Sequence, residues 1–152
     1  MSVFSIRPMS ETDVAAVCLV EQQIYEFPWT QKNFIDSIQA GYEAHCMWID
    51  YSLAGYVIMM PVLDEYHLLN ISIRADLQGQ GMGRQLLQWG IGRGRSAGMQ
   101  GMLLEVRPTN ESARSLYESE GFKLVGTRKN YYPSKDGRED ALVLFKRFQQ
   151  ML

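Results

Sequence analysis

The stretch Gln78-Gly-Gln-Gly-Met-Gly-Arg84 decides the fold, because it places a glycine at every second position between two apolar segments. The segment before it, His67 to Ile73, has the composition of a β-strand, and the segment after it carries Leu86, Leu87 and Ile91 on one side of a helix. Glycine has no Cβ, so such a loop adopts positive φ angles and brings several backbone N–H groups onto one anion. We therefore expect the loop to bind a phosphate.

Two other interpretations of the loop are weaker. A P-loop ends in Gly-Lys-Ser/Thr, whereas Gly83 is followed by Arg84, and no hydroxyl is placed to hold Mg²⁺. A dinucleotide-binding fingerprint would begin at Gly79 and could use Glu105 as its acidic residue about 20 positions on, but Arg84 stands where close helix packing requires glycine. A tight turn that binds nothing also stays open from the loop alone.

Composition narrows the class of protein. The chain has 152 residues, 46% hydrophobic and 21% charged, which is typical of a single globular domain over residues 1–152. Its net charge of −2 gives no basic field for nucleic acid. Cys18 and Cys46 suggest neither a disulfide framework nor a zinc cluster, and His45 next to Cys46 should point to the opposite face of a strand. With no signal core and no long apolar run, we expect a cytoplasmic monomer that binds no metal, nucleic acid or membrane.

Periodicity predicts a mixed α/β chain. Helices are expected after Ser10, after Thr30, after the glycine loop and after Asn110, with Gly121 as the residue that ends the last of these. Strands are expected at residues 3–7, 44–49, 53–62, 67–73, 102–106, 123–128 and 141–148, with Asp64-Glu65 as a turn and residues 130–140 as a long loop. A crossover unit is expected from the strand at 67–73 through the glycine loop and its helix to the apolar strand at 102–106. Such a unit implies that the two strands are parallel. Gly90, Gly92 and Gly94 each weaken the helix by about 1 kcal/mol relative to alanine, so packing must hold it.

A family resemblance follows from further strings along nearly the whole chain. The chain resembles the bacterial RimI-type branch of the GCN5-related N-acetyltransferases (GNAT), whose Gln/Arg-x-x-Gly-x-Gly/Ala loop is matched by Gln78, Gly81 and Gly83. The other strings that carry the resemblance are Phe27-Pro-Trp29, Leu63-Asp-Glu65, Asn70-Ile-Ser-Ile73, Leu104-Glu-Val-Arg107, Asn110, Leu116-Tyr-Glu-Ser119, Gly121-Phe122, Asn130-Tyr-Tyr-Pro133 and Asp136-Gly-Arg-Glu-Asp140. The last two strings are particular to this branch.

The resemblance implies a GNAT fold, a mixed and mostly antiparallel sheet with flanking helices, in which two parallel strands splay apart to admit acetyl-CoA. It implies that the pantetheine arm follows the strand at Ile71, Ser72 and Ile73, that Asn110 contacts the same arm, and that the pyrophosphate sits on the loop residues Gly79, Gln80, Gly81, Met82, Gly83 and Arg84. A helix N-terminus independently suits a diphosphate, because its first N–H groups and dipole are directed at the anion. Gly79 stands where close relatives often carry a basic residue, so one cation near the phosphates is lost unless Arg84 compensates.

Two residues are expected to carry the chemistry of acetyl transfer. Glu105 stands in a mainly apolar strand and is the candidate base that takes the proton of the acceptor amine, directly or through water. An ion pair with Arg107 is the structural alternative. Tyr117 is the candidate acid for the departing thiolate, since a phenol with a reference pKa near 10 is protonated at neutral pH. A half-buried packing role is its alternative.

The resemblance further implies that the acceptor is the N-terminal alanine of ribosomal protein eighteen of the small subunit. Trp29, Tyr131 and Tyr132, with the acidic residues Glu43, Asp64 and Glu65, are expected to receive a basic peptide. Acetylation of a lysine or of a small-molecule amine such as an aminoglycoside is the alternative within enzymes. A CoA-binding sensor without catalysis is the alternative outside them, although Glu105 and Tyr117 together argue against it.

Overall fold

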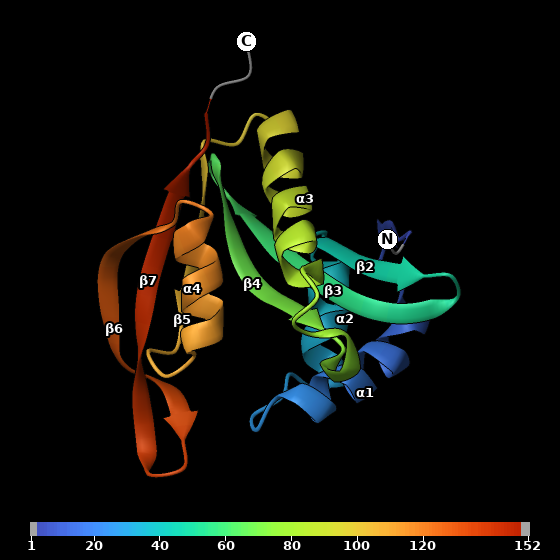
Figure 1. Cartoon of the computed structure of the whole chain (residues 1–152), viewed down its shortest axis with the longest axis horizontal. Helices are drawn as coiled ribbons and strands as arrows, with labels where there is room; N and C mark the ends of the chain where they lie inside the picture. The colour runs from blue at the N-terminus through green and yellow to red at the C-terminus, as the bar shows by residue number, and fades with distance from the viewer. Residues whose placement is uncertain (1–2, 150–152) are drawn as a thin grey trace. The chain divides into compact units, whose positions relative to one another are not determined.

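The computed structural model describes residues 3–149 and contains one mixed sheet. Its seven strands lie in the order β1-β2-β3-β4-β5-β7-β6. β7 and β6 can be followed next to each other in Figure 1. β4 and β5 run parallel, whereas the pairs β1–β2, β2–β3, β5–β7 and β6–β7 run antiparallel. The elements, in chain order, are β1 (Ser5–Pro8), η1 (Glu11–Asp13), α1 (Val14–Ile24), α2 (Gln31–Gln39), β2 (Glu43–Ile49), β3 (Ser52–Val62), β4 (Glu65–Ile73), η2 (Ala75–Leu77), α3 (Met82–Ser96), β5 (Gly101–Val106), α4 (Glu111–Ser119), β6 (Lys123–Ser134) and β7 (Gly137–Arg147). The expected mixed α/β class and the parallel strand pair are confirmed.

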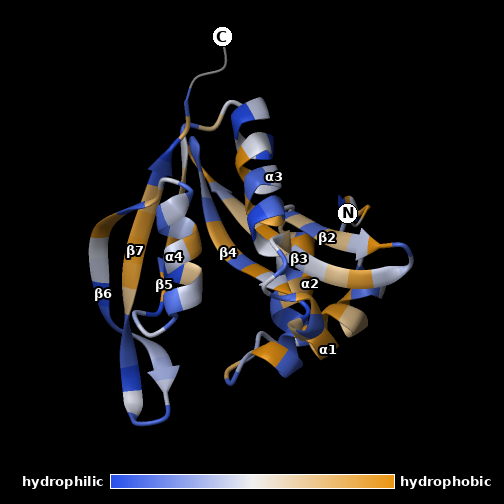
Figure 2. Ribbon diagram, viewed as in Figure 1, coloured by the Kyte–Doolittle hydropathy of each residue, from blue (hydrophilic) through white to orange (hydrophobic). Residues whose placement is uncertain are grey.

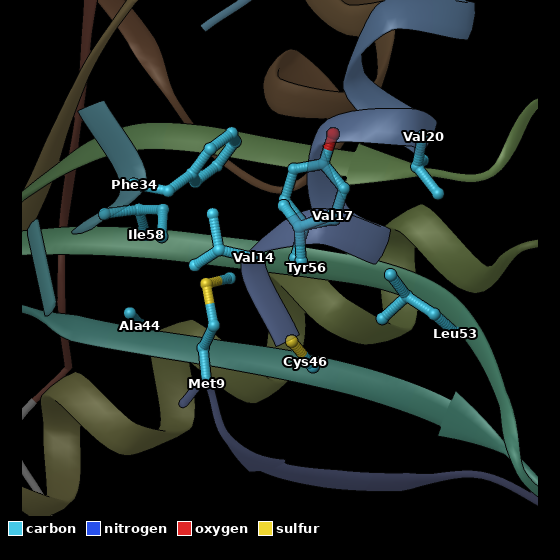
Figure 3. Close-up of a cluster of buried hydrophobic side chains, with 10 residues drawn as sticks. All are labelled: Met9, Val14, Val17, Val20, Phe34, Ala44, Cys46, Leu53, Tyr56 and Ile58. Atoms are coloured by element: carbon cyan, nitrogen blue, oxygen red, sulfur yellow. The ribbon is translucent and has the colours of Figure 1, made fainter. Parts of the chain in front are cut away.

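The described chain divides into two compact units, and the first comprises residues 3–61 and 69–90. Its core packs residues of α1 and α2 against β2 and β3, and Figure 3 shows Phe34, Val14 and Tyr56 pointing toward one another within it. Phe34 and Tyr56 meet edge to face with ring centroids 5.7 Å apart. The predicted cap of α2 is confirmed, because the Thr30 hydroxyl accepts from the Asn33 backbone N–H at 3.2 Å and the Asn33 side chain accepts from the Thr30 backbone N–H at 2.9 Å.

The second unit comprises residues 62–68 and 91–149. It contains α4 and the long β6–β7 hairpin, which is hydrophilic toward its turn and hydrophobic along the later part of β7 (Figure 2). α4 ends as predicted. Gly121 has a φ of +93°, its N–H donates to the Glu118 carbonyl at 3.1 Å, and the Phe122 N–H donates to the Tyr117 carbonyl at 3.0 Å. The ring of Phe122 then packs on Tyr117 with centroids 5.7 Å apart, so the cap fixes where Tyr117 lies.

The prediction of a long loop at residues 130–140 is wrong. β6 continues to Ser134 and β7 begins at Gly137, so most of this segment is a two-stranded hairpin. The register shifts between Arg128 and Tyr132, where Asn130 takes a φ of +51° and its N–H donates to the Asp140 carboxylate at 2.9 Å. β6 advances four residues from Arg128 to Tyr132 while β7 advances two from Glu139 to Ala141, so the irregularity absorbs two extra residues of β6 before the pairing resumes. The turn expected at Asp64-Glu65 also lies one residue earlier, at Leu63 and Asp64.

Packing explains one of the unfavourable glycines of α3. A Cβ on Gly94 would lie 2.7 Å from Cε2 of Phe148 and 3.1 Å from Cδ2 of Tyr66, so only glycine admits these rings. A Cβ on Gly92 would meet nothing within 4 Å. The helix is therefore held at Gly94 by close aromatic contact, as the low helix propensity required, and Gly92 needs another reason.

Candidate functional site

The glycine loop of unit 1 has the backbone geometry that its sequence predicts. Gly79 and Gly81 have φ angles of +79° and +86°, which side chains with a Cβ rarely adopt. A Cβ at either position would meet nothing within 4 Å, so the requirement for glycine is conformational and not one of space. α3 starts at Met82, and the Gln85 N–H donates to the Gly81 carbonyl at 3.1 Å as the first helical turn closes. The N–H groups of the residues that open such a helix lack intrahelical acceptors and can receive an anion.

The strand end before this loop is held from both sides within unit 1. A Cβ on Gly55 of β3 would lie 2.6 Å from the Ser72 carbonyl oxygen, so the two backbones approach closely there. The Gln78 side-chain amide donates to the Ile73 carbonyl at 2.9 Å. Ser72 is buried, its hydroxyl lies 2.6 Å from the Tyr25 hydroxyl, and it donates to Asn70 Oδ1 at 2.8 Å. The side chain of Ser72 is thus occupied by the fold, which leaves its backbone as the part that could contact a cofactor.

A buried carboxylate in α1 organises the same region. Glu21 is 2% exposed and accepts hydrogen bonds from the Tyr56 hydroxyl at 2.8 Å, the Asn70 amide at 3.0 Å and the Trp29 backbone N–H at 2.9 Å. It therefore ties α1 to β3, to β4 and to the segment that carries Trp29. Glu21 was not predicted from the sequence, although a single acid among the apolar residues of α1 was a signal for it.

The backbone of Trp29 is held by the hydrogen bond from its N–H to Glu21. Its ring packs on Phe34 with centroids 5.0 Å apart and is partly buried against the core of unit 1. Packing of this kind gives Trp29 a structural role, and a contact with an acceptor stays a prediction. Of the acidic residues expected nearby, Glu43 is half-buried in β2, Asp64 is exposed in the turn and Glu65 begins β4.

Glu105 of unit 2 has partners that the sequence analysis did not predict. Its Oε2 lies 2.6 Å from Nε2 of His67, and its Oε1 accepts from Nη1 of Arg128 at 3.1 Å. The side chain of Glu105 is 8% exposed and that of His67 is 18% exposed. Burial alone would raise the pKa of Glu105, but the hydrogen bond and charge of His67, followed by those of Arg128, outweigh it and hold the pKa below its ordinary value. The carboxylate form of Glu105 is thus favoured in the folded protein at neutral pH.

The alternative ion pair between Glu105 and Arg107 is wrong. Arg107 donates instead to Glu139 at 3.1 Å and to the Pro133 carbonyl at 2.8 Å, and its guanidinium lies 4.4 Å from the centre of the Tyr132 ring. Glu105 and Arg107 share a face of β5, as alternation predicted, but Glu105 bonds residues of β4 and β6, whereas Arg107 bonds residues of β6 and β7. In the sequence His67 and Arg128 are only polar residues of expected strands, and such residues do not identify a partner.

Tyr131 and Tyr132 lie in the same group of side chains. Their rings meet edge to face at 4.9 Å, and the Arg128 guanidinium lies 4.7 Å from the centre of the Tyr131 ring. Burial first, and then the charge of Glu105, raise the pKa of Tyr132. The structure therefore brings both tyrosines into the surroundings of Glu105.

Tyr117 and Asn110 occupy the two ends of α4. Asn110 caps the helix by accepting from the Ala113 N–H at 3.2 Å, as predicted, and Tyr117 is 8% exposed near the C-terminal end. Neither observation tests a role in catalysis or in cofactor binding.

Among residues 3–149, no group of three or more histidine, cysteine or acidic residues is placed to hold a metal ion, and no helix is long and apolar enough to cross a membrane.

Comparison with known proteins agrees with the fold. The sequence model of the Acetyltransferase (GNAT) family matches residues 14–122. The chain is 39% identical to the [ribosomal protein bS18]-alanine N-acetyltransferase of Escherichia coli strain K12 over 140 residues, which are 92% of this chain and 95% of that protein. It is 40% identical to the protein of the same name from Haemophilus influenzae, over 91% of this chain and 95% of that one. The crystal structure of the ribosomal-protein-S18-alanine N-acetyltransferase from Escherichia coli superposes with a TM-score of 0.91 at 37% identity, covering 99% of this chain and 96% of that one.

These matches define the class of protein that the sheet and the glycine loop indicate, an acyl-transferring enzyme. The chain belongs to the GCN5-related N-acetyltransferase family, and the resemblance to its ribosomal-alanine-modifying branch extends over nearly the whole sequence.

Proposed function

We propose that this protein transfers the acetyl group of acetyl-CoA to the N-terminal α-amino group of a protein, and that the acceptor is the N-terminal alanine of ribosomal protein bS18. The observation that carries the proposal is the similarity over more than nine tenths of the chain to enzymes named for that acceptor. The positive φ angles of Gly79 and Gly81 support acetyl-CoA as the donor.

The proposed roles rest on separate features of the two units. In unit 1, the amides of residues 79–84 receive the pyrophosphate, and the backbone of residues 71–73 receives the pantetheine, supported from behind by the buried Ser72 side chain. In unit 2, Asn110 contacts the pantetheine. Glu105 takes the proton of the acceptor amine, directly or through water, and Tyr117 donates a proton to the departing thiolate.

The tyrosine pair is proposed to select the acceptor. Tyr131 and Tyr132 offer aromatic rings next to the ionised Glu105, which together suit a peptide with a positively charged N-terminus followed by basic and aromatic residues. We propose a cytoplasmic, monomeric enzyme that consists of one domain and needs no metal.

Three peptides test the proposal. One begins Ala-Arg-Tyr, the second has the same sequence with a blocked N-terminus, and the third has a blocked N-terminus and an internal lysine. Acetyl-CoA-dependent modification of the first peptide alone is expected, as measured by thiol release. Reaction of the third peptide at the rate of the first would overturn the α-amine assignment, whereas no reaction with any amine would overturn acetyl transfer itself.

Variants test the roles of individual residues. Glu105→Gln is expected to lower turnover by about 10²-fold at neutral pH with little change in acetyl-CoA affinity, and Tyr117→Phe should slow the same step. Tyr132→Ala should reduce kcat/KM for the Ala-Arg-Tyr peptide more than for a generic small amine. If Glu105→Gln retains normal turnover, Glu105 has only its structural contacts.

A further inference from the structure

Arg107, the first residue after β5, contacts both strands of the β6–β7 hairpin in unit 2. Tyr132 and Glu139 stand directly opposite each other in the hairpin, so their side chains lie on the same face of the sheet. Nη1 of Arg107 donates to Oε1 of Glu139 at 3.1 Å and to the Pro133 carbonyl at 2.8 Å. Its guanidinium carbon lies 4.4 Å from the centre of the Tyr132 ring. A single cation therefore holds the Tyr132 ring and the strand opposite it.

Glu139 joins this group to the turn that precedes α4. Its Oε2 accepts from the Thr109 hydroxyl at 2.8 Å and from the Thr109 backbone N–H at 3.3 Å. Thr109 directly precedes Asn110, the N-cap of α4. The side chains of Arg107 and Glu139 are 27% and 18% exposed, so their ion pair is better shielded from water than a pair at the surface. Both oxygens of Glu139 are thus used to fix Arg107 and the hairpin to the end of β5.

Tyr132 stands at a place in β6 where the regular pairing gives little support. The register is irregular from Arg128 onward, and Tyr132 is the residue at which pairing with β7 resumes. The Tyr131 ring packs against Tyr132 edge to face with centroids 4.9 Å apart, and Arg107 lies over the ring. A guanidinium held by a carboxylate and a carbonyl is already ordered, so it can fix the ring at little further cost in entropy. These contacts preset the Tyr132 ring.

Two simpler roles for Arg107 make different predictions. An arginine that acted on the acceptor through its charge alone would repel a basic peptide, so its removal would improve peptide binding. An ion pair that only stabilised the hairpin would, once removed, lower activity equally for every amine. A residue that positions Tyr132 differs from both, because its removal harms only those acceptors that extend to the tyrosine.

We propose that Arg107 is a positioning residue that selects the acceptor by fixing the Tyr132 ring, and that Glu139 keeps Arg107 in place. This inference rests on the proposed function. Arg107 acts through Tyr132 and takes no part in the making or breaking of bonds. A ring that is preset loses less conformational freedom when a peptide binds, so the pair favours a peptide over a small amine with the same reacting group.

Steady-state kinetics with two acceptors test the proposal. The Ala-Arg-Tyr peptide extends beyond its first residue, whereas alanine amide offers the same α-amine without the following residues. Arg107→Gln is expected to raise KM for the peptide by about tenfold and to change kcat by less than about twofold. Its kcat/KM for alanine amide should fall by less than about threefold, and its KM for acetyl-CoA should stay at the wild-type value.

Two further variants serve as comparisons. Arg107→Lys keeps the charge without the planar fork, so its KM for the peptide should lie between those of the wild type and Arg107→Gln. The matched control is Arg147→Gln, which removes the same charge from an exposed residue at the other end of β7, opposite Gly101. This control should keep the wild-type constants for both acceptors.

A double-mutant cycle shows whether Arg107 acts through Tyr132. Once Tyr132→Ala has removed the ring, Arg107→Gln should cause little further loss of kcat/KM for the peptide. The double variant should therefore be about tenfold more active than the product of the two single losses predicts. Losses that multiply in full would show that Arg107 acts independently of Tyr132 and would overturn the proposal.

The remaining outcomes separate this proposal from the proposed function. An unchanged or lowered KM for the peptide in a folded Arg107→Gln protein, or an equal loss with alanine amide, would overturn the role of Arg107 and leave the acetyltransferase assignment in place. No reaction of the wild type with either acceptor would overturn the proposed function and this inference with it. Circular dichroism reports folding. Should Arg107→Gln not fold, Glu139→Gln, which keeps the shape of the side chain and weakens its bond to Arg107, decides by the same kinetics with a change in the same direction.

Discussion

Replacing Glu21 by glutamine tests whether its buried carboxylate holds unit 1 together. Three donors, the Tyr56 hydroxyl, the Asn70 amide and the Trp29 N–H, converge on its two oxygens. A glutamine keeps the shape but has one accepting oxygen, and its NH₂ group must face at least one of these donors. Hydrogen bonds to a charged group contribute about 1.5–3 kcal/mol each, and a buried donor left without an acceptor costs about 1–3 kcal/mol.

We expect Glu21→Gln to lower the free energy of unfolding by about 2–4 kcal/mol, because one bond is lost and the others lose their charge assistance. In a chain of this size that loss corresponds to a decrease in Tm of about 4–16 °C. Urea unfolding followed by circular dichroism measures it directly. Exposed Glu26, five residues further on, offers the same substitution as a control and should change stability by less than about 0.5 kcal/mol.

A double-mutant cycle separates the Glu21–Tyr56 bond from the rest of the network. Tyr56→Phe removes only the hydroxyl, which lies 2.8 Å from Glu21, so the two substitutions should be less than additive by about 1 kcal/mol or more. Strict additivity, or a Glu21→Gln protein as stable as the Glu26→Gln control, would show that the Glu21 carboxylate does not hold unit 1 together.

Three other predictions concern the glycine loop, helix α3 and Glu105. Gly81→Val should abolish the rise in Tm that acetyl-CoA causes, while Gly98→Val, at a similar φ of +78° and with equally open space, should keep it; loss of the shift in both would show a general effect of strain. Gly94→Ala should destabilise the protein by about 1–3 kcal/mol in urea unfolding because its Cβ meets aromatic rings, whereas Gly92→Ala should stabilise it by up to about 1 kcal/mol, and equal effects would contradict the packing argument. Folding lowers the pKa of Glu105, so the unfolded chain binds more protons in acid than the folded chain does. The stability that Glu105 contributes is therefore present above about pH 4.5 and is lost as pH falls through the lowered pKa. Glu105→Gln should flatten this part of the stability–pH curve.

Local signals in the sequence predicted the parts of the fold that depend on a few adjacent residues. The Thr30 cap, the Gly121 helix end and the positive φ angles of the glycine loop each follow from residue types whose backbone preferences are strong. The hairpin at residues 123–147 was missed at its tip because turn-forming residues and charges there resemble a loop, while the bulge at Asn130 depends on a hydrogen bond to Asp140 ten residues away.

Pairing between distant strands was the part that sequence could not supply. Glu105 was found from its own strand, but its partners come from β4 and β6, 38 and 23 residues away. Arg107 was the nearer cation in sequence, yet β7 offers it Glu139 instead. Only the order and register of the strands decide such a choice between possible ion pairs.

The position of the acetyl group in a peptide with two competing amines tests the central claim most directly. The peptide would begin Ala-Arg-Tyr and carry one internal lysine, and tandem mass spectrometry after partial reaction with acetyl-CoA would locate the modification. We expect acetyl on the N-terminal alanine in at least about tenfold excess over the lysine, a difference of about 1.4 kcal/mol between the two transition states. Equal modification of the two amines, or preference for the lysine, would contradict it.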